Sequence, residues 1–163
     1  SEEGQGFVFA MQGLDGGRIN IATCSLGTAQ AALDQAQAHL NTRKQFGRTL
    51  GEFQGLQFKL ADMATQLVAA RQMVRLAASK LDKDDPEKSV YCAMAKRFAT
   101  DAGFEVCNEA LQIFGGYGYI REYPLERFVR DTRVHQILEG TNEIMRHIIA
   151  RRLLLDGATE IIR

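Results

Sequence analysis

Residues 53–81 read FQGLQFKLADMATQLVAARQMVRLAASKL, and this stretch decides the fold. Its apolar residues return every three or four positions without a break, which places them along one face of an α-helix. A helix with such a long apolar face must bury it against other helices. The residues of this face are Leu56, Leu60, Met63, Leu67, Ala70, Val74, Ala77 and Leu81.

The same period occurs on both sides of this stretch. It predicts a helix over residues 18–45, preceded by a polar corner at 13–17 and followed by a loop at 46–51. A turn at residues 82–86 leads to a further helix that Pro86 opens and the glycines at 115–118 end. The expected buried stripes are Ala22, Leu26, Ala29, Leu33, Ala36 and Leu40 in the first helix, and Ala95, Phe98, Ala102, Val106, Ala110 and Ile113 in the other.

The remaining sequence predicts a short helix over 125–129, a linker at 134–138 and a last helix over 141–155, with Ile144, Ile148 and Leu155 facing inward. Long helices with short connections favour antiparallel neighbours. We therefore expect an all-α protein, an up-and-down four-helix bundle with a short extra helix, forming one domain over residues 1–163.

Composition excludes several classes of protein. The 163 residues are 45% hydrophobic and 25% charged, with a net charge of zero, so a nucleic-acid partner is not expected. No apolar run is long enough to span a membrane, and residues 1–4 show no secretory signal. The cysteines are odd in number and widely spaced, which indicates free, buried thiols in a reducing compartment. They are Cys24, Cys92 and Cys107.

Metal and nucleophilic sites find little support in the sequence. A helical di-iron site needs Glu-x-x-His pairs, and none of His39, His135 and His147 has a glutamate three residues before it. No metal site is therefore expected, and no G-x-S-x-G nucleophile motif is present. The glycines at 115–118 follow a helix rather than a strand, which indicates helix termination rather than a dinucleotide fingerprint.

The segment LEGTNE at residues 138–143 differs from the rest, because a glutamate stands between an apolar run and a helix start. Gly140 allows close backbone approach, and Thr141 and Asn142 offer capping side chains and free amides that suit an anion. Packing beside Ile137 and Leu138 would raise the pKa of Glu139, as a general base requires. On spacing alone, a solvated linker residue is the favoured explanation of Glu139, and helix-end cations explain Arg43 and Arg151.

Four blocks, in this order, resemble the C-terminal helical domain of the acyl-CoA dehydrogenase flavoproteins. They are LDGGR (14–18), RKQFG (43–47) with FQ (53–54) and LADM (60–63), QIFGGYGY (112–119), and RD (130–131) followed by LEGTNEIMR (138–146). The resemblance covers essentially the whole chain. Full members of the family also contain an N-terminal helical domain and a middle β-domain, so this chain resembles an excised C-terminal domain, which is expected to be inactive alone.

The resemblance implies that FAD takes a hydride while an acyl-CoA thioester becomes the 2-enoyl-CoA. Glu139 matches the base that removes the pro-R α-proton, with its own backbone N–H and a flavin ribityl hydroxyl polarising the thioester carbonyl. Some members carry this base on the first helix, at the position of Gly17, which has no carboxylate. The resemblance therefore assigns the base to Glu139.

The resemblance also implies binding roles for further residues. Those matching substrate contacts are Asp15, Gly16, Gly17, Arg18, Gly140 and Arg151. Those matching FAD contacts are Arg43, Phe53, Gln54, Gln112, Ile113, Phe114, Gly115, Gly116, Thr141, Asn142 and Glu143. Arg43 matches an arginine that reaches the diphosphate of a flavin held mainly by another subunit.

The implied partners are a second copy of the chain, usually within a homotetramer, and electron-transferring flavoprotein. The sequence at residues 117–119 and 133–140 is most similar to that of members that act on short 2-methyl-branched substrates such as isobutyryl-CoA. The implied location is the cytoplasm for a bacterial source and the mitochondrial matrix for a eukaryotic one. The competing hypotheses are an acyl-CoA oxidase and a non-catalytic helical assembly module.

Overall fold

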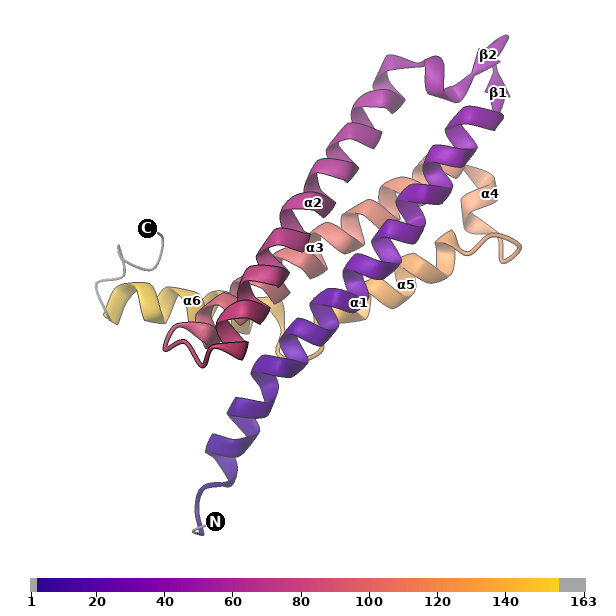
Figure 1. Cartoon of the computed structure of the whole chain (residues 1–163). Coiled ribbons are helices and arrows are strands. Elements are labelled where there is room, and N and C mark those ends of the chain that lie inside the picture. Colours follow the sequence, from indigo (N-terminus) through magenta and orange to yellow (C-terminus); the bar gives the residue numbers. More distant parts are fainter. Residues whose placement is uncertain (1–2, 156–163) are drawn as a thin grey trace.

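Helices make up most of the computed structural model, which describes residues 3–155. Figure 1 shows a long α1 (Gly6–Thr42) leading through a small hairpin and a 3-10 turn into α2, with the rest of the chain folding back alongside. The expected all-α class is confirmed. The other elements are β1 (Lys44–Gln45), β2 (Arg48–Thr49), η1 (Leu50–Glu52), α2 (Gln54–Asp82), α3 (Lys88–Phe114), α4 (Gly116–Tyr119), α5 (Leu125–His135) and α6 (Asn142–Leu155).

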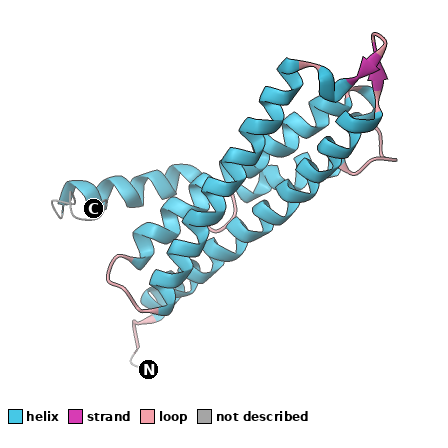
Figure 2. Ribbon diagram, turned by 45° about the horizontal axis from the view of Figure 1, so that its top comes forward, coloured by secondary structure: helices cyan, strands magenta, loops and turns pink. Residues whose placement is uncertain are grey.

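Four helices lie side by side with alternating direction, namely α1, α2, α3 and α5 (Figures 1 and 2). The helix expected over 125–129 continues to His135 and completes this bundle. In contrast, α6 packs on α3 and projects away from the other helices (Figure 2). The sequence pattern suggested that the last helix belongs to the bundle and that the helix beginning at residue 125 is the short extra one. In the structure α5 is the fourth helix of the bundle, because it is long enough to cover the open side of α3, and α6 is the additional helix.

The apolar stripes predicted from the sequence form the core. Leu67, Ala70 and Ala77 of α2 are fully or almost fully buried, and the predicted alanines of α1 and α3 join them. Small side chains bring α1 and α3 very close: a Cβ atom placed on Gly103 would lie 3.0 Å from the Ser25 Cβ and 3.2 Å from the Ser25 carbonyl oxygen. The central helix α3 thus contacts α1, α2, α5 and α6.

The polar corner expected at 13–17 is wrong, because these residues lie inside α1. Asp15 and Arg18 face inward from this part of the helix and are 3% and 5% exposed. At its other end, α1 stops at Thr42 rather than near residue 45. A β-hairpin follows, whose two-residue loop consists of Phe46 and Gly47 at φ of 52° and 80°. Positive φ at both central positions is typical of a type I′ turn.

The inward face of α6 also differs from the expectation. Ile144 is 50% exposed, whereas Met145 is fully buried and Ile148 is partly buried. The buried Asn142 sets this register, because a residue three positions further on, Met145, shares its side of the helix. The side chain of Leu155 lies outside the described residues.

The three cysteines are free, but only two of them are buried as expected. Burial raises the pKa of Cys92 to about 11 and that of Cys107 to about 12, so both thiols are protonated at neutral pH. Cys24 is exposed, because it lies beside Thr23 on the outer face of α1. Within the described range, no helix is both long and apolar enough to cross a membrane.

Candidate active site

Glu139 lies in the turn between α5 and α6, where the backbone reverses sharply. Leu138 N donates to Val134 O (3.0 Å), which extends α5, and Asn142 N donates to Gln136 O (3.0 Å), which closes the turn. Between these bonds Glu139 and Gly140 adopt φ of 56° and 91°. A glutamate in the left-handed region is uncommon and costs free energy, so the surrounding contacts must hold it there.

The carboxyl group of Glu139 reaches across to α1 and lies directly over Gly17. A Cβ atom on Gly17 would stand 2.3 Å from Glu139 Oε2 and 2.6 Å from Cδ, a spacing that no side chain permits. Only glycine at position 17 leaves room for this carboxyl group without a shift. The structure thus brings together Glu139 and Gly17, the two positions at which the resemblance places the base.

Beside this contact lies a buried ion pair on α1. Arg18 Nη1 donates to Asp15 Oδ1 at 2.7 Å, and Ser89 Oγ of α3 donates to Asp15 Oδ2. The Nε of Arg18 is buried and has no hydrogen-bond partner among residues 3–155. A buried donor without an acceptor is costly, so this end of α1 is suited to receive a polar or anionic group.

Ile137 and Leu138 do not supply the apolar shielding expected around Glu139. Ile137 and Leu138 are 50% and 43% exposed, so these two side chains do not enclose the carboxyl group. Glu139 itself is partly buried, with α1 as its wall. The position against Gly17 does not fit a freely solvated linker residue.

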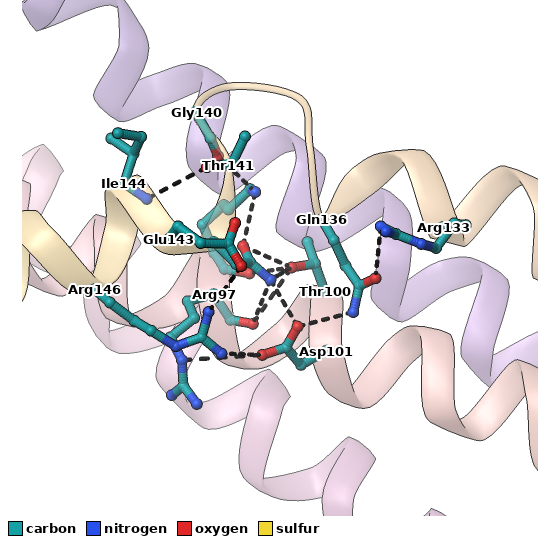
Figure 3. Close-up of polar contacts among 12 residues, drawn as sticks. Arg97, Thr100, Asp101, Arg133, Gln136, Gly140, Thr141, Glu143, Ile144 and Arg146 are labelled. Atoms are coloured by element: carbon teal, nitrogen blue, oxygen red, sulfur yellow. Dashed lines mark hydrogen bonds and ion pairs between the residues drawn. The ribbon is translucent and has the colours of Figure 1, made fainter.

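A fully buried lysine stands beneath the turn, and Figure 3 shows the polar network around it. Lys96 Nζ of α3 donates to the Gly140 carbonyl oxygen and to Asn142 Oδ1, each at 2.8 Å. Asn142 Nδ2 in turn donates to Asp101 Oδ1 (2.7 Å) and Thr100 Oγ1 (2.9 Å). Burial lowers the pKa of Lys96 to about 8.

This network determines which groups at the start of α6 are bonded within the fold and which are exposed. Asn142 is 3% exposed, its side chain is turned toward α3 and its N–H donates to Gln136 O, so Asn142 holds the turn and offers no free group to an outside ligand. Thr141 Oγ1 accepts a hydrogen bond from Ile144 N at 3.4 Å, the expected capping contact. Glu143 is exposed and pairs with Arg146 at 3.5 Å.

The remaining predicted cofactor residues gather at the opposite end of the bundle. They line or adjoin a cavity of about 530 Å³ that contains Arg43, Ile113, Phe114, Gly115 and Gly116. Gln112 is exposed at the end of α3, while Phe53 caps the start of α2 and lies under the Arg48 guanidinium, 4.0 Å from its Cζ, with Gln54 next to it.

Arg43 is exposed at this cavity, 5.5 Å from the ring centre of Tyr117. None of the ion pairs within residues 3–155 includes it. Gly115 at φ 60° and Gly116 leave their backbone bare, since a Cβ on either would meet nothing within 4 Å. The Gly115 N–H already donates to Gln112 O at 3.1 Å, so the unpaired Arg43 guanidinium is the group that suits this cavity to a phosphate.

The predicted residues therefore form two groups that are far apart. Glu139 and Gly140 lie beside Gly17 and Arg18 in the first half of α1, and Arg43 follows the end of this helix, about 38 Å away at 1.5 Å per helical residue. Asp15 and Gly16 belong to the first group. Arg151 lines a separate cleft of about 480 Å³ with Ser89, the residue that bonds Asp15.

Sequence analysis missed Lys96, Thr100 and Asp101. A signal for Lys96 was present, because it occupies a core position of α3 one turn after Cys92 and among Ala93, Ala95 and Ala99. A lysine within such a stripe is rarely fully buried without partners. Within the described range, no three His, Cys, Asp or Glu side chains come together as a metal site would require.

Comparisons with known proteins identify the family to which the chain is similar. The family described as "Acyl-CoA dehydrogenase, C-terminal domain" matches residues 4–154. Isobutyryl-CoA dehydrogenase, mitochondrial, of Bos taurus is 57% identical over 153 residues, which are 94% of this chain and 37% of that protein.

Two solved structures are also similar. Butyryl-CoA dehydrogenase from Megasphaera elsdenii superposes with a TM-score of 0.92 at 49% identity, covering 94% of this chain and 40% of that one. A structure described as electron transferring flavoprotein of Acidaminococcus fermentans gives a TM-score of 0.93 at 49% identity, covering 96% and 41%. The chain thus spans about two fifths of the length of the proteins that it matches.

Proposed function

Because the chain belongs to the acyl-CoA dehydrogenase family, as its C-terminal domain, we propose that it carries the catalytic base of an enzyme that dehydrogenates a short acyl-CoA. In this proposal it acts within a longer polypeptide that also has an N-terminal helical and a middle β-domain. The relatives' greater length supports this arrangement, since residues 4–154 match only the C-terminal domain of the family.

The observation that carries the proposal is the Glu139 carboxyl group held against Gly17. In the reaction, the Cα–H bond breaks and its proton passes to the Glu139 carboxylate. The Cβ–H bond breaks with its electron pair, and the C=C bond forms between the two carbons. FAD, when bound, supplies the acceptor for that hydride.

A thioester α-proton is only weakly acidic, so the carbonyl must be polarised while Glu139 removes the proton. The backbone N–H of Glu139 is available for this task, because no group within residues 3–155 accepts a hydrogen bond from it. The N–H and the carboxyl group belong to one residue in a fixed left-handed conformation, so both can act on neighbouring atoms of a single substrate.

The groups that match FAD contacts have a chemistry that fits this cofactor. The unpaired Arg43 suits a diphosphate, the glycines at 115 and 116 leave space beside it, and the start of α6 at residues 141–143 matches the family's other flavin contacts. Arg43, Phe53, Gln54 and residues 112–116 would hold one flavin, and residues 141–143 another. A separation of about 38 Å along α1 supports this division.

Two flavin-facing groups on one chain support a homo-oligomer, with a tetramer as the expected form. Exposed apolar side chains on the first turns of α1, among them Phe7 and Phe9, also favour contact with a further domain or subunit. Electron-transferring flavoprotein is the proposed electron acceptor, and the similarity to the A. fermentans structure supports it.

For the substrate we propose a short, 2-methyl-branched acyl-CoA such as isobutyryl-CoA. The support is the 57% identity to the bovine isobutyryl-CoA dehydrogenase. That relative is mitochondrial, so the matrix is the proposed location for a eukaryotic source and the cytoplasm for a bacterial one.

A substrate and acceptor profile of the full-length polypeptide tests the proposal. Flavin reduction is followed with isobutyryl-CoA, butyryl-CoA and octanoyl-CoA, and turnover is followed with electron-transferring flavoprotein or with oxygen alone. We expect the highest kcat/KM with isobutyryl-CoA, and turnover that requires the flavoprotein. Rapid turnover on oxygen would identify an oxidase, and no flavin reduction by any thioester would leave a helical assembly module.

A further inference from the structure

The buried Lys96 has no part in the chemistry described above, although burying a charged amine is costly. It lies in the middle of α3 and is 0% exposed. Neither of its hydrogen-bond acceptors is a side-chain carboxylate: one is the Gly140 carbonyl and the other is Asn142 Oδ1. Both acceptors belong to the turn that carries Glu139.

The two acceptors of Lys96 lie on either side of Thr141, in the turn that follows Glu139. One ammonium therefore fixes both the peptide after Gly140 and the side chain that opens α6. Asn142 passes this restraint on, because its Nδ2 is held by Asp101 and Thr100 of the same helix. Gln136, on the other side of the turn, also donates to Asp101 Oδ1 at 2.8 Å.

Glu139 needs such a restraint because its own conformation is unfavourable. Two successive residues have positive φ, and one of them carries a side chain. Without a bond to the Gly140 carbonyl, the turn is free to relax toward ordinary backbone conformations. That relaxation would carry the Glu139 carboxyl group and its N–H away from the position over Gly17.

We propose that Lys96 is a positioning residue for the base, and that its two hydrogen bonds to Gly140 and Asn142 hold the Glu139 turn in its working conformation. This inference rests on the proposed function. Lys96 touches neither substrate nor cofactor in this account. It acts through the backbone that carries Glu139, so its loss lowers the rate of α-proton removal more than it lowers substrate affinity.

The test uses the full-length enzyme with Lys96→Met, which keeps the length of the side chain and removes the donors. A second variant, Lys96→Gln, keeps a shorter amide donor that reaches fewer acceptors. The matched control is Lys59→Met, which removes a lysine that bridges α2 to Glu109 of α3, away from the turn. Flavin content and thermal unfolding are measured for each variant.

For Lys96→Met we expect kcat per bound flavin to fall at least tenfold while KM changes less than threefold. The primary isotope effect with α-deuterated substrate should rise, because proton removal becomes slower relative to the other steps. Backbone amides at 139–143 should exchange hydrogen faster in the substrate-free enzyme. Lys96→Gln should lie between the wild type and Lys96→Met, and Lys59→Met should match the wild type.

A folded, flavin-loaded Lys96→Met variant with kcat within twofold of the wild type would overturn the proposal. Failure of both variants to fold would overturn it as well, since Lys96 would then be a stabilising residue of the bundle. The proposed function is judged separately, and it fails when the wild type does not dehydrogenate any acyl-CoA. The inference about Lys96 fails when the wild type is active and the Lys96→Met variant is equally active.

Discussion

At the scale of single residues, the absence of a side chain at Gly17 leaves the space that the Glu139 carboxyl group occupies. The resemblance indicated that one of these two positions carries the base, and the structure shows that a side chain at position 17 would displace the Glu139 carboxyl group. The Glu139 carboxyl group already occupies the space where a Cβ of residue 17 would stand. Two positions far apart in the sequence thus share one location in the fold.

This contact predicts the effect of Gly17→Ala. The added methyl group meets the end of a flexible side chain, so the carboxyl group moves by about 1 Å rather than the helix. We expect stability to be maintained or raised, since alanine favours the helix by up to about 1 kcal/mol. The kcat of the full-length enzyme should fall about ten- to a hundredfold, as a misplacement of this size implies.

The control for this prediction is Gly13→Ala, on the same helix, where a Cβ meets nothing within 4 Å. It should leave kcat unchanged. Steady-state kinetics and thermal unfolding measure both variants. An unchanged kcat for Gly17→Ala would show that the precise location of the carboxyl group does not matter.

Lys96 predicts a pH effect on stability. Burial lowers its pKa from 10.5 to about 8, so between these values the unfolded chain binds a proton that the folded chain does not. The contribution of Lys96 is therefore full above pH 10.5 and is lost as the pH falls toward 8, by about 1.4 kcal/mol for each unit of displacement.

Urea unfolding of this 163-residue chain and its Lys96→Met variant, at pH 7 to 10, checks this prediction. The free energy of unfolding of the unchanged chain, relative to that of the variant, should rise with pH above 8. A difference that stays constant across this range would mean that Lys96 keeps an ordinary pKa in the folded state.

At the scale of helices, periodicity predicted the bundle well because the core consists of simple stripes. The Leu67 to Ala77 face of α2 is buried as its spacing indicated. The same reasoning failed at residues 13–17, where glycines suggested a corner. There the inward-facing Asp15 and Arg18 keep the chain helical, and an ion pair of this kind has no signature in an apolar pattern.

The candidate site was predictable only in part for a similar reason. The resemblance placed Glu139 and Gly17, and the structure brings them into contact. Lys96 could not be placed from its own helix, because its partners Gly140 and Asn142 lie in a turn 44 and 46 residues further on. Long-range polar contacts depend on the packing of α6 on α3, which local spacing does not encode.

The close approach of α1 and α3 predicts that Gly103→Ala destabilises the fold. A Cβ at this position would press on the Ser25 backbone, which cannot move aside as a side chain would. Overpacking costs about 1–3 kcal/mol, and the higher helix propensity of alanine offsets up to about 1 kcal/mol of it.

Gly27→Ala on α1 is the matched substitution, since nothing lies within 4 Å of its Cβ position. It should stabilise the chain by up to about 1 kcal/mol. Chemical unfolding of this chain measures both changes. Equal effects of the two substitutions would contradict the close helix packing.

At the scale of the whole molecule, the account places two functional groups at opposite ends of one long helix. The base and its neighbours lie near Gly17, while Arg43 and the bare glycines after α3 lie about 38 Å away. Under the proposed function, one chain of this shape contributes to two different cofactor sites, as the proposed assembly into an oligomer requires. The bundle is then a rigid spacer that sets the distance between neighbouring sites.

The most direct test of the central claim is the rate of flavin reduction by isobutyryl-CoA in the full-length enzyme with Glu139→Gln, followed anaerobically by rapid mixing. The substitution keeps the shape of the side chain and its place over Gly17 but removes the proton acceptor. The account predicts unchanged folding and flavin content with a rate at least about a hundredfold lower. A fully flavinated variant that is reduced at nearly the wild-type rate would show that Glu139 is not the base.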